Sequence, residues 1–399
     1  MNKEILSLSS VVNRGELEEY IFLLEAKEAC LVERLCGKRY NRERRDFVRL
    51  KTKKRVILTR NGRVERYFVH VKNVKSGEVF SPLLRELGIG KGQQCSVEFK
   101  QVLARKASKM PYRKSVEDIR DSFGFGLSRM TLHKYVQEEC SSLDIEQTGP
   151  VDHRVLLGDG TKVRNGDGHH EARAIMSIGQ DTSDKALLRH AINTTWKDMA
   201  KSIDLQQYRA FVGDGEPGLQ EALCAPHMKF HYCHEHAHRD VALFLWKDGL
   251  GKKEYSQYVE RFKSILYCLQ HSTEKHKRDK DWSRLSWRIL WAKQEIRNLA
   301  ALLSTKELHT AAGFLMRHVD HFTTAAELAI EGINMPWTTN AIERVMQEIG
   351  NRTKKKGMYW SEQGLDNILK MVLKRYFLPN DQRTYKDVFT TSSPEAVKT

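Results

Sequence analysis

Two acidic residues stand in the same unusual setting in this 399-residue chain. Asp159 and Asp214 each lie within a Gly-Asp-Gly tripeptide, and each tripeptide follows a short apolar run typical of a buried strand. A carboxylate at the end of such a strand is fixed by the sheet and still reachable from outside. Asp-Gly is also common in turns, which explains either residue alone equally well. Two matched settings favour a shared chemical role.

Carboxylates of this kind suit Mg²⁺, which takes few protein ligands and leaves positions for water and phosphate. Two such ions, about 3.5–4 Å apart, activate the attacking oxygen and stabilise the leaving oxygen of a phosphodiester. We therefore expect two Mg²⁺ ions as cofactors, with Mn²⁺ as a substitute, and a third carboxylate. Glu343 is the best candidate because it lies near the start of an amphipathic segment, TTNAIERVMQEIGNR, which Thr339 or Asn340 is expected to cap. The predicted buried stripe of that helix is Ile342, Val345, Met346 and Ile349.

The formal net charge of the chain is +16, with 67 Lys and Arg against 51 Asp and Glu. This balance predicts a polyanionic partner, with an anionic membrane as the weaker option. Most of the excess lies between Arg34 and Lys75, where Asn61-Gly62 predicts a hairpin with a type I′ turn. A solvated charged face is the alternative to a DNA-binding hairpin. The hairpin residues expected to contact DNA are Lys53, Lys54, Arg55, Arg60 and Arg63.

A second segment, SVEDIRDSFGFGLSRMTLHKYVQEE, predicts a helix, a glycine-containing turn and another helix. Ser128 is the expected N-cap of the second helix. An ordinary helical hairpin would have the same pattern, but basic residues before it favour a helix-turn-helix that binds DNA. The expected core face of the second helix is Leu132, Tyr135 and Val136, which leaves Arg129, Thr131, His133 and Lys134 to contact DNA.

The order of these patterns predicts a multidomain α/β protein. Beyond the linker-like stretch at 141–152, five apolar strand-like runs and two helical ones indicate a mixed sheet, and the region after it is helical. The expected parts are an N-terminal helical segment at 1–34, a basic β-hairpin module at 35–80, a helix-turn-helix domain at 81–146, an α/β region at 147–245, a helical region at 246–330, a segment with the amphipathic helix at 331–385 and a tail at 386–399.

Five of these residues, in their motifs, resemble the Mutator-like superfamily of DDE transposases, which includes many prokaryotic insertion-sequence enzymes. They are Asp159 in LLGDGTKV, Asp214 in FVGDGEPGL, Cys233 and His236 in HYCHEHAHRD, and Glu343 in TTNAIER. The resemblance covers roughly residues 150–380. It implies an RNase H-like catalytic domain whose first part is 147–245 and whose C-terminal part is 331–385, with an α-helical insertion at 246–330 before the glutamate helix. It also implies that the three acids are the catalytic metal ligands and that the Cys-x-x-His pair lies beside them.

The histidine-rich segment HYCHEHAHRD has a second interpretation. Cys233, His234, His236 and His238 could together bind zinc. The spacing matches no familiar zinc finger, and we predict this segment to be a strand, on which neighbouring side chains point to opposite faces. We therefore favour the interpretation in which Cys233 and His236 shape the active site without binding metal.

Tryptophans and basic residues follow in the C-terminal half. Trp282, Trp287, Trp291 and Trp337 could stack on an unpaired DNA base, but packing in a helical core is the simpler expectation. A basic cluster follows the glutamate helix, where it would hold phosphates of the cleaved strand, although a plain surface cluster explains it too. Its members are Arg352, Lys354, Lys355 and Lys356.

The resemblance implies a DNA transposase that binds the terminal inverted repeats of its element and then cleaves and transfers DNA strands. The expected partners are double-stranded DNA and other copies of the chain, in a homodimer or higher oligomer, with no small-molecule cofactor. The alternatives are a transposase-derived DNA-binding regulator and an RNase H-fold nuclease. No apolar run approaches the ~18 residues of a membrane span, and seven scattered cysteines without a Cys-x-x-Cys pair suggest reduced thiols. We expect a cytoplasmic, nucleoid-associated protein of a prokaryote, without membrane contact.

Overall fold

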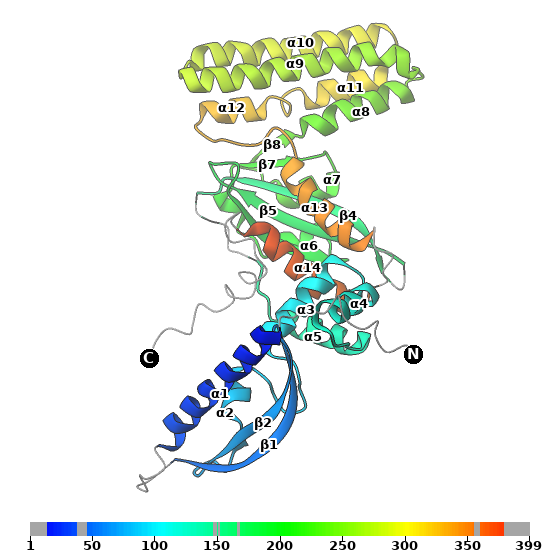
Figure 1. Cartoon of the computed structure of the whole chain (residues 1–399). Coiled ribbons are helices and arrows are strands. Elements are labelled where there is room, and N and C mark those ends of the chain that lie inside the picture. Colours follow the sequence, from blue (N-terminus) through cyan, green and yellow to red (C-terminus); the bar gives the residue numbers. More distant parts are fainter. Residues whose placement is uncertain are drawn as a thin grey trace, which may run out of the picture. The chain divides into compact units, whose positions relative to one another are not determined.

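The computed structural model describes residues 14–37, 46–146, 150, 152–165, 168–354 and 360–378. Over these residues the chain forms fourteen α-helices and two β-sheets, which confirms a mixed α/β protein. It divides into two compact units (Figure 1): a terminal unit of Met1–Asp144 with Gln363–Thr399, and a central unit of Ile145–Glu362. None of the helices in the described ranges combines the length and apolar character needed to cross a membrane.

A long β-hairpin lies where the basic hairpin is expected, but its turn differs from the prediction. Thr59 pairs with Gly62, so Arg60 and Asn61 connect the strands. Gly62 has a φ of 124°, whereas Asn61 is not among the described residues with positive φ. A type I′ turn needs positive φ at both central residues. The positive φ falls on the glycine alone because it has no Cβ to clash. The hairpin and its surroundings consist of α1 (Arg14–Cys36), β1 (Phe47–Thr59), β2 (Gly62–Asn73) and β3 (Val79–Phe80).

One buried ion pair ties α1 to the hairpin. Glu28 interrupts the apolar face of α1, and only 4% of its surface is exposed. Its carboxylate accepts a hydrogen bond from the Val69 N–H at 2.9 Å and pairs with the Arg66 guanidinium at 2.7 Å. Burial raises the pKa of Glu28 despite these partners. The acid is therefore tolerated in the core only because the hairpin satisfies it.

The predicted helix–turn–helix segment forms two helices with the expected cap. The Ser128 hydroxyl accepts a hydrogen bond from the Thr131 N–H at 3.0 Å, and Gly124 ends the preceding helix with a φ of 70°. A helix from the far end of the chain joins this unit, since Asn367 donates a hydrogen bond to Gln137 at 2.7 Å. The expected catalytic segment 331–385 is thus divided between the units. The helices are α2 (Pro82–Glu86), α3 (Val97–Lys109), α4 (Tyr112–Phe123), α5 (Arg129–Ser141) and α14 (Glu362–Phe377).

The central unit is built on a five-stranded sheet in the order β6-β5-β4-β7-β8. β4, β5 and β6 are antiparallel neighbours, whereas β7 and β8 run parallel to β4. The parallel strands are buried almost throughout, as strands covered on both faces are. The sheet elements are β4 (Val155–Asn165), β5 (Gly168–Ile178), β6 (Lys185–Ile192), α6 (Trp196–Ala200), the 3₁₀ helix η1 (Leu205–Gln207), β7 (Ala210–Gly213), α7 (Pro217–Leu223) and β8 (Lys229–Tyr232).

A helical insertion follows β8 and returns the chain to the sheet. Both ends of the insertion meet beside β8, where the His234 N–H donates to the Trp337 carbonyl at 3.0 Å. The chain then enters α13 (Asn340–Thr353), which packs on β4 and β5 with its predicted stripe buried. The insertion contains α8 (His234–Lys247), the long pair α9 (Lys252–Asp279) and α10 (Trp282–Thr305), then α11 (His309–His318) and α12 (Thr324–Ile330), as Figure 1 shows.

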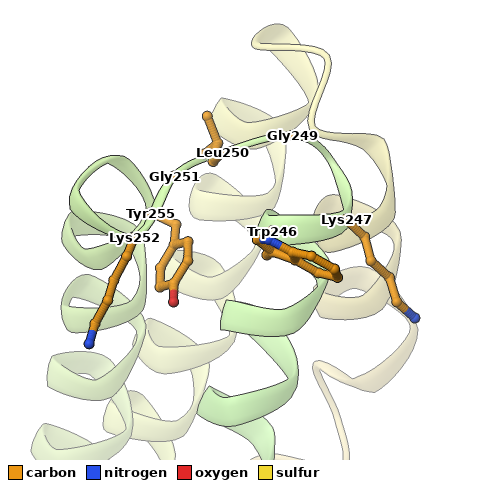
Figure 2. Close-up of a pocket in the computed structure, with 7 residues that line it drawn as sticks. All are labelled: Trp246, Lys247, Gly249, Leu250, Gly251, Lys252 and Tyr255. Atoms are coloured by element: carbon orange, nitrogen blue, oxygen red, sulfur yellow. The ribbon is translucent and has the colours of Figure 1, made fainter.

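The tryptophans of the insertion do not all pack in its core. Trp282 and Trp337 are partly buried against the core, as expected. Trp287 and Trp291 are 73% and 37% exposed, which corrects the expectation for these two. At the junction of α8 and α9 the rings of Trp246 and Tyr255 line a pocket (Figure 2). The residues that line it all come from 246–255, so it includes none of the predicted site residues.

The ion pair beneath the hairpin gives a stability prediction. Arg66→Ala leaves the Glu28 carboxylate buried without its partner, and we expect a loss of about 3 kcal/mol in the free energy of unfolding. Arg63→Ala is the matched control, because its pair with Glu65 is exposed and should contribute less than about 1 kcal/mol. Urea denaturation followed by circular dichroism measures both. Equal losses in the two variants would contradict the importance of the buried pair.

Candidate active site

The parallel pairing of β4 with β7 places the two Gly-Asp-Gly aspartates side by side. Leu157 is in register with Val212, so two residues further along each strand the chain reaches Asp159 and Asp214. Asp214 directly follows the last residue of β7, as predicted. Asp159 lies within β4 and not at its end, which corrects the prediction. The physical reason is that antiparallel pairing with β5 carries β4 on to Asn165 after β7 has stopped.

The glycine before Asp159 is required by close packing. A Cβ on Gly158 would lie 2.8 Å from Leu219 and 2.9 Å from Leu223, both on α7. Successive side-chain positions on a strand face opposite sides of the sheet. Asp159 therefore points away from α7, toward the side where Glu343 influences it. The glycine lets the helix lie directly on the sheet, and the aspartate occupies the opposite face.

Glu343 is held at the start of α13 by Thr339. The Thr339 hydroxyl donates a hydrogen bond to the Glu343 carboxylate at 2.7 Å and also lies 3.2 Å from the Cys233 sulfur. Thr339 occupies the N-cap position as expected, but its side chain makes no capping hydrogen bond. It positions the glutamate instead, a role that the capping pattern did not reveal.

The negative charges of Asp214 and Glu343 both act on Asp159. Burial, together with the negative charges of Asp214 and Glu343, raises the pKa of Asp159 to about 7, although a hydrogen bond from the Gly160 N–H at 2.7 Å acts in the opposite direction. Residues from β4, from the end of β7 and from α13 thus influence one another across long sequence separations. The predicted triad is brought together in space.

This donor set fits a pair of hard divalent cations. Burial and the negative charges of Asp214 and Glu343 raise the pKa of Asp159, and a bound cation would offset that repulsion. Among the described residues, Asp159, Asp214 and Glu343 do not form a group with one ligand atom each all within 4.8 Å. Two ions about 3.5–4 Å apart do not require all three acids on one ion. Oxygen ligands with open positions are what Mg²⁺ prefers.

Cys233 and His236 lie at a strand–helix junction and not on a strand, which corrects the prediction for this segment. β8 ends at Tyr232 and α8 begins at His234, so Cys233 is the N-cap and His236 lies in the first turn. Burial alone would raise the pKa of the Cys233 thiol, but hydrogen bonds from His236 and Thr339 hold it below its usual value. The same hydrogen bond raises the pKa of His236. The pair lies beside Glu343, with the His236 Nδ1 3.7 Å from the carboxylate.

The zinc set of Cys233, His234, His236 and His238 is not formed. The His234 ring is buried between the Phe322 carbonyl, at 2.9 Å, and the Gln270 side chain, at 2.7 Å. Burial lowers the pKa of His234 to about 4, so it serves as a neutral hydrogen-bonding group in the core. His238 lies near Glu235 instead.

A fourth acid next to the site was missed by the sequence analysis. Asp240 accepts a hydrogen bond from the Tyr232 hydroxyl at 2.7 Å, and burial raises its pKa, with a further contribution from Asp214. Its signal is the spacing of four residues from His236, which places both on one face of a helix. The prediction of a strand at HYCHEHAHRD hid this helical spacing.

The basic residues predicted to contact DNA differ in accessibility. Arg352 is buried, with its guanidinium over the ring of Trp360 at 4.6 Å, so it is not a surface phosphate contact. Lys354 is exposed beside β4, where it donates to the Thr161 hydroxyl at 2.7 Å. Lys355 and Lys356 lie outside the described residues.

In the terminal unit, exposure separates the predicted contacts into two groups. Arg55 is half-buried and donates a hydrogen bond to the Gln93 carbonyl at 2.6 Å. Lys54 is exposed, but it pairs with Glu65 at 2.8 Å. Thr131 and His133 are also half-buried, the first against Ser128 and the second against the Tyr112 ring. The exposed predicted contacts are Lys53, Lys54, Arg60, Arg63, Arg129 and Lys134.

The raised pKa of Asp159 predicts a pH-dependent stability. The folded chain keeps this proton up to about pH 7, whereas an unperturbed aspartate has a pKa of 3.8. The unfolded state loses its proton first, so the free energy of unfolding falls as pH rises from about 4 to about 7. Asp159→Asn removes this effect. We expect the stability of the variant relative to the parent to increase by roughly 2 kcal/mol from pH 5 to pH 8 in EDTA.

Urea denaturation at the two pH values measures this difference. Glu274→Gln, on the exposed face of α9, is the control and should change little between them. A constant difference between Asp159→Asn and the parent at both pH values would show that the site does not hold this proton.

A scan against models of protein families gave no match. A search of curated proteins also gave no match.

Proposed function

We propose that this protein is a DNA transposase of the DDE type, similar to the Mutator-like superfamily of prokaryotic insertion sequences. The observation that carries the proposal is the cluster of Asp159, Asp214 and Glu343. They come from three segments far apart in the sequence, and the two partner charges raise the pKa of Asp159. Three carboxylates at one position, in a chain with a net charge of +16, suit phosphoryl transfer on a nucleic acid.

The arrangement of the central unit supports an RNase H-like catalytic domain. Three antiparallel strands are followed by two strands parallel to β4, and α13 carries the third acid back to the first strand. The insertion between β8 and α13 agrees with the family resemblance. The terminal unit supports recognition of element ends, because an exposed basic hairpin and a capped helix with exposed Arg129 are both suited to DNA.

In the proposed mechanism the chain's own residues position the reacting groups. Asp159 and Asp214 would hold a pair of Mg²⁺ or Mn²⁺ ions together with Glu343. When bound, these ions lower the pKa of water and stabilise the leaving oxygen. Thr339 fixes the direction of the Glu343 carboxylate, and Lys354 supplies a positive charge beside β4 for a DNA phosphate. Cleavage frees a 3′-hydroxyl, which attacks target DNA at the same site, and a dimer or larger assembly would hold two ends.

A cleavage assay tests the proposed chemistry. The substrate is a duplex with the inverted repeat that flanks the coding sequence, in Mg²⁺. Asp214→Ala and Glu343→Gln should abolish cleavage and leave DNA binding nearly unchanged, because both remove metal ligands and not DNA contacts. Glu348→Gln is the matched control. It lies five residues after Glu343, about 140° further around the helix, and it is exposed, so its variant should keep most activity.

The outcomes separate the rival functions. Cleavage by folded Asp214→Ala would overturn the two-ion assignment. Specific binding of the repeat without cleavage by the parent protein would indicate a DNA-binding regulator. Cleavage without joining to a target duplex would indicate a nuclease.

The terminal unit gives a separate prediction about binding. Arg129→Ala should weaken binding to the repeat by about 1–3 kcal/mol and relax its sequence preference. Replacing Lys53 and Arg60 together by glutamine should weaken binding to any duplex and reduce the salt slope by about 2. Lys54→Gln should have a smaller effect, since Lys54 already pairs with Glu65. Binding titrations at several salt concentrations measure these effects. If all three variants bound DNA as the parent does, the terminal unit would not be the part that recognises DNA.

A further inference from the structure

A second possible ligand set lies next to the carboxylate cluster. The Cys233 sulfur, the His236 Nδ1 and a Glu343 carboxylate oxygen all lie within 4.8 Å of one another. Cys233 and His236 come from the junction of β8 and α8, and Glu343 comes from the first turn of α13. Thr339 connects the two elements, since its N–H and its hydroxyl lie 3.3 Å and 3.2 Å from the Cys233 sulfur.

The chemistry of this set differs from that of the three acids. Sulfur, imidazole and carboxylate together suit Zn²⁺, whereas Mg²⁺ prefers oxygen alone. Zinc–ligand distances of about 2.0–2.3 Å at tetrahedral angles put ligand atoms roughly 3.4–3.6 Å apart. The His236 Nδ1 lies 3.7 Å from the Glu343 oxygen, close to that separation. Small side-chain movements would bring the remaining pairs into range.

The Thr339 hydroxyl contacts all three side chains and holds them in place, at 2.7 Å from a Glu343 oxygen, 3.2 Å from the Cys233 sulfur and 3.4 Å from the His236 Nδ1. The three come from only two helix starts, and both starts are fixed to each other through Thr339. Three protein ligands leave one position for water, the pattern of an open zinc site. The other group of this kind in the described chain, Asp152, His153 and Asp184, is less suited. That group has no sulfur ligand, and its two aspartates are exposed.

We propose that Cys233, His236 and Glu343 form a Zn²⁺ site, and that zinc bound there takes Glu343 away from the Mg²⁺ pair. Zinc would then be a reversible inhibitor, because the Glu343 oxygen that it holds is no longer available to the Mg²⁺ pair. The inhibitory consequence rests on the proposed function, but zinc binding itself does not. The two sites share Glu343 but differ in the softness of their other ligands. The zinc site has a thiolate and an imidazole, whereas the Mg²⁺ site has carboxylates alone.

Cobalt binding tests the site without any activity measurement. Co²⁺ replaces Zn²⁺ in such sites and gives a sulfur-to-metal absorption band when a thiolate coordinates it. The reduced full-length protein, titrated with Co²⁺ without Mg²⁺, should show this band, and one equivalent of Zn²⁺ should remove it. Cys233→Ser should lose the band. Cys268→Ser, an exposed cysteine on α9, should keep it and serves as the matched control.

A second variant keeps the test informative if Cys233→Ser does not fold. Glu343→Gln retains the thiolate, so the band should persist while the affinity for Co²⁺ falls at least about tenfold, since a carboxylate ligand is lost. No band in the parent protein, a band unchanged in folded Cys233→Ser, or an unchanged affinity in Glu343→Gln would each overturn the site. Thermal melting verifies that the variants fold.

An inhibition experiment separates this proposal from the proposed function. If the parent cleaves DNA in Mg²⁺, then Zn²⁺ at concentrations that displace Co²⁺ should stop cleavage, and EDTA followed by fresh Mg²⁺ should restore it. Cleavage that persists with the zinc site filled would overturn the inhibitory part. A normal cobalt band in a protein that never cleaves DNA would overturn the transposase proposal and leave the zinc site standing.

Discussion

The short parallel contact between β4 and β7 is the constraint on which the candidate site depends. Only three residues of each strand pair, and they set the register that puts Asp159 beside Asp214. A slip of one residue would turn one carboxylate to the opposite face of the sheet. Gly158 reinforces this register, because α7 packs so closely on it that no side chain fits there. The chemistry therefore depends on backbone pairing and on the lack of a Cβ as much as on the acids themselves.

The third acid arrives by a different kind of interaction. α13 lies more than a hundred residues beyond β7 in the sequence, and local side-chain contacts fix its start. Thr339 contacts both Cys233 and Glu343, and the Trp337 carbonyl accepts the His234 N–H. The buried rings of His231 and His234 complete this junction. Neutral histidines suit this core because they bond to carbonyls without a charge to desolvate.

Residue patterns predicted the site acids and most elements, and they failed where the outcome depended on tertiary pairing. The stripe of α13, the Ser128 cap and the five strands follow from local periodicity and propensity. The length of β4 depended on its pairing with β5. The end of β8 depended on where α8 begins, and local sequence patterns did not distinguish the first turn of α8 from a strand. The burial of Arg352 over Trp360 could not be predicted from the sequence, because a basic residue near a helix end is usually exposed to solvent. Thr339 likewise looked like a cap until its true neighbours were known.

A backbone hydrogen bond between His234 and Trp337 closes the helical insertion at its base. The closed loop has about a hundred residues, and the strands and α13 are connected there whatever the loop contains. The entropy of closing a loop grows only slowly with its length. Longer helices α9 and α10 would therefore add little closure entropy, whereas α12 is tied to β8, because the Thr324 hydroxyl donates a hydrogen bond to the Phe230 carbonyl at 2.8 Å. The surface that α9 and α10 present can therefore vary while the sheet that carries the candidate site stays the same.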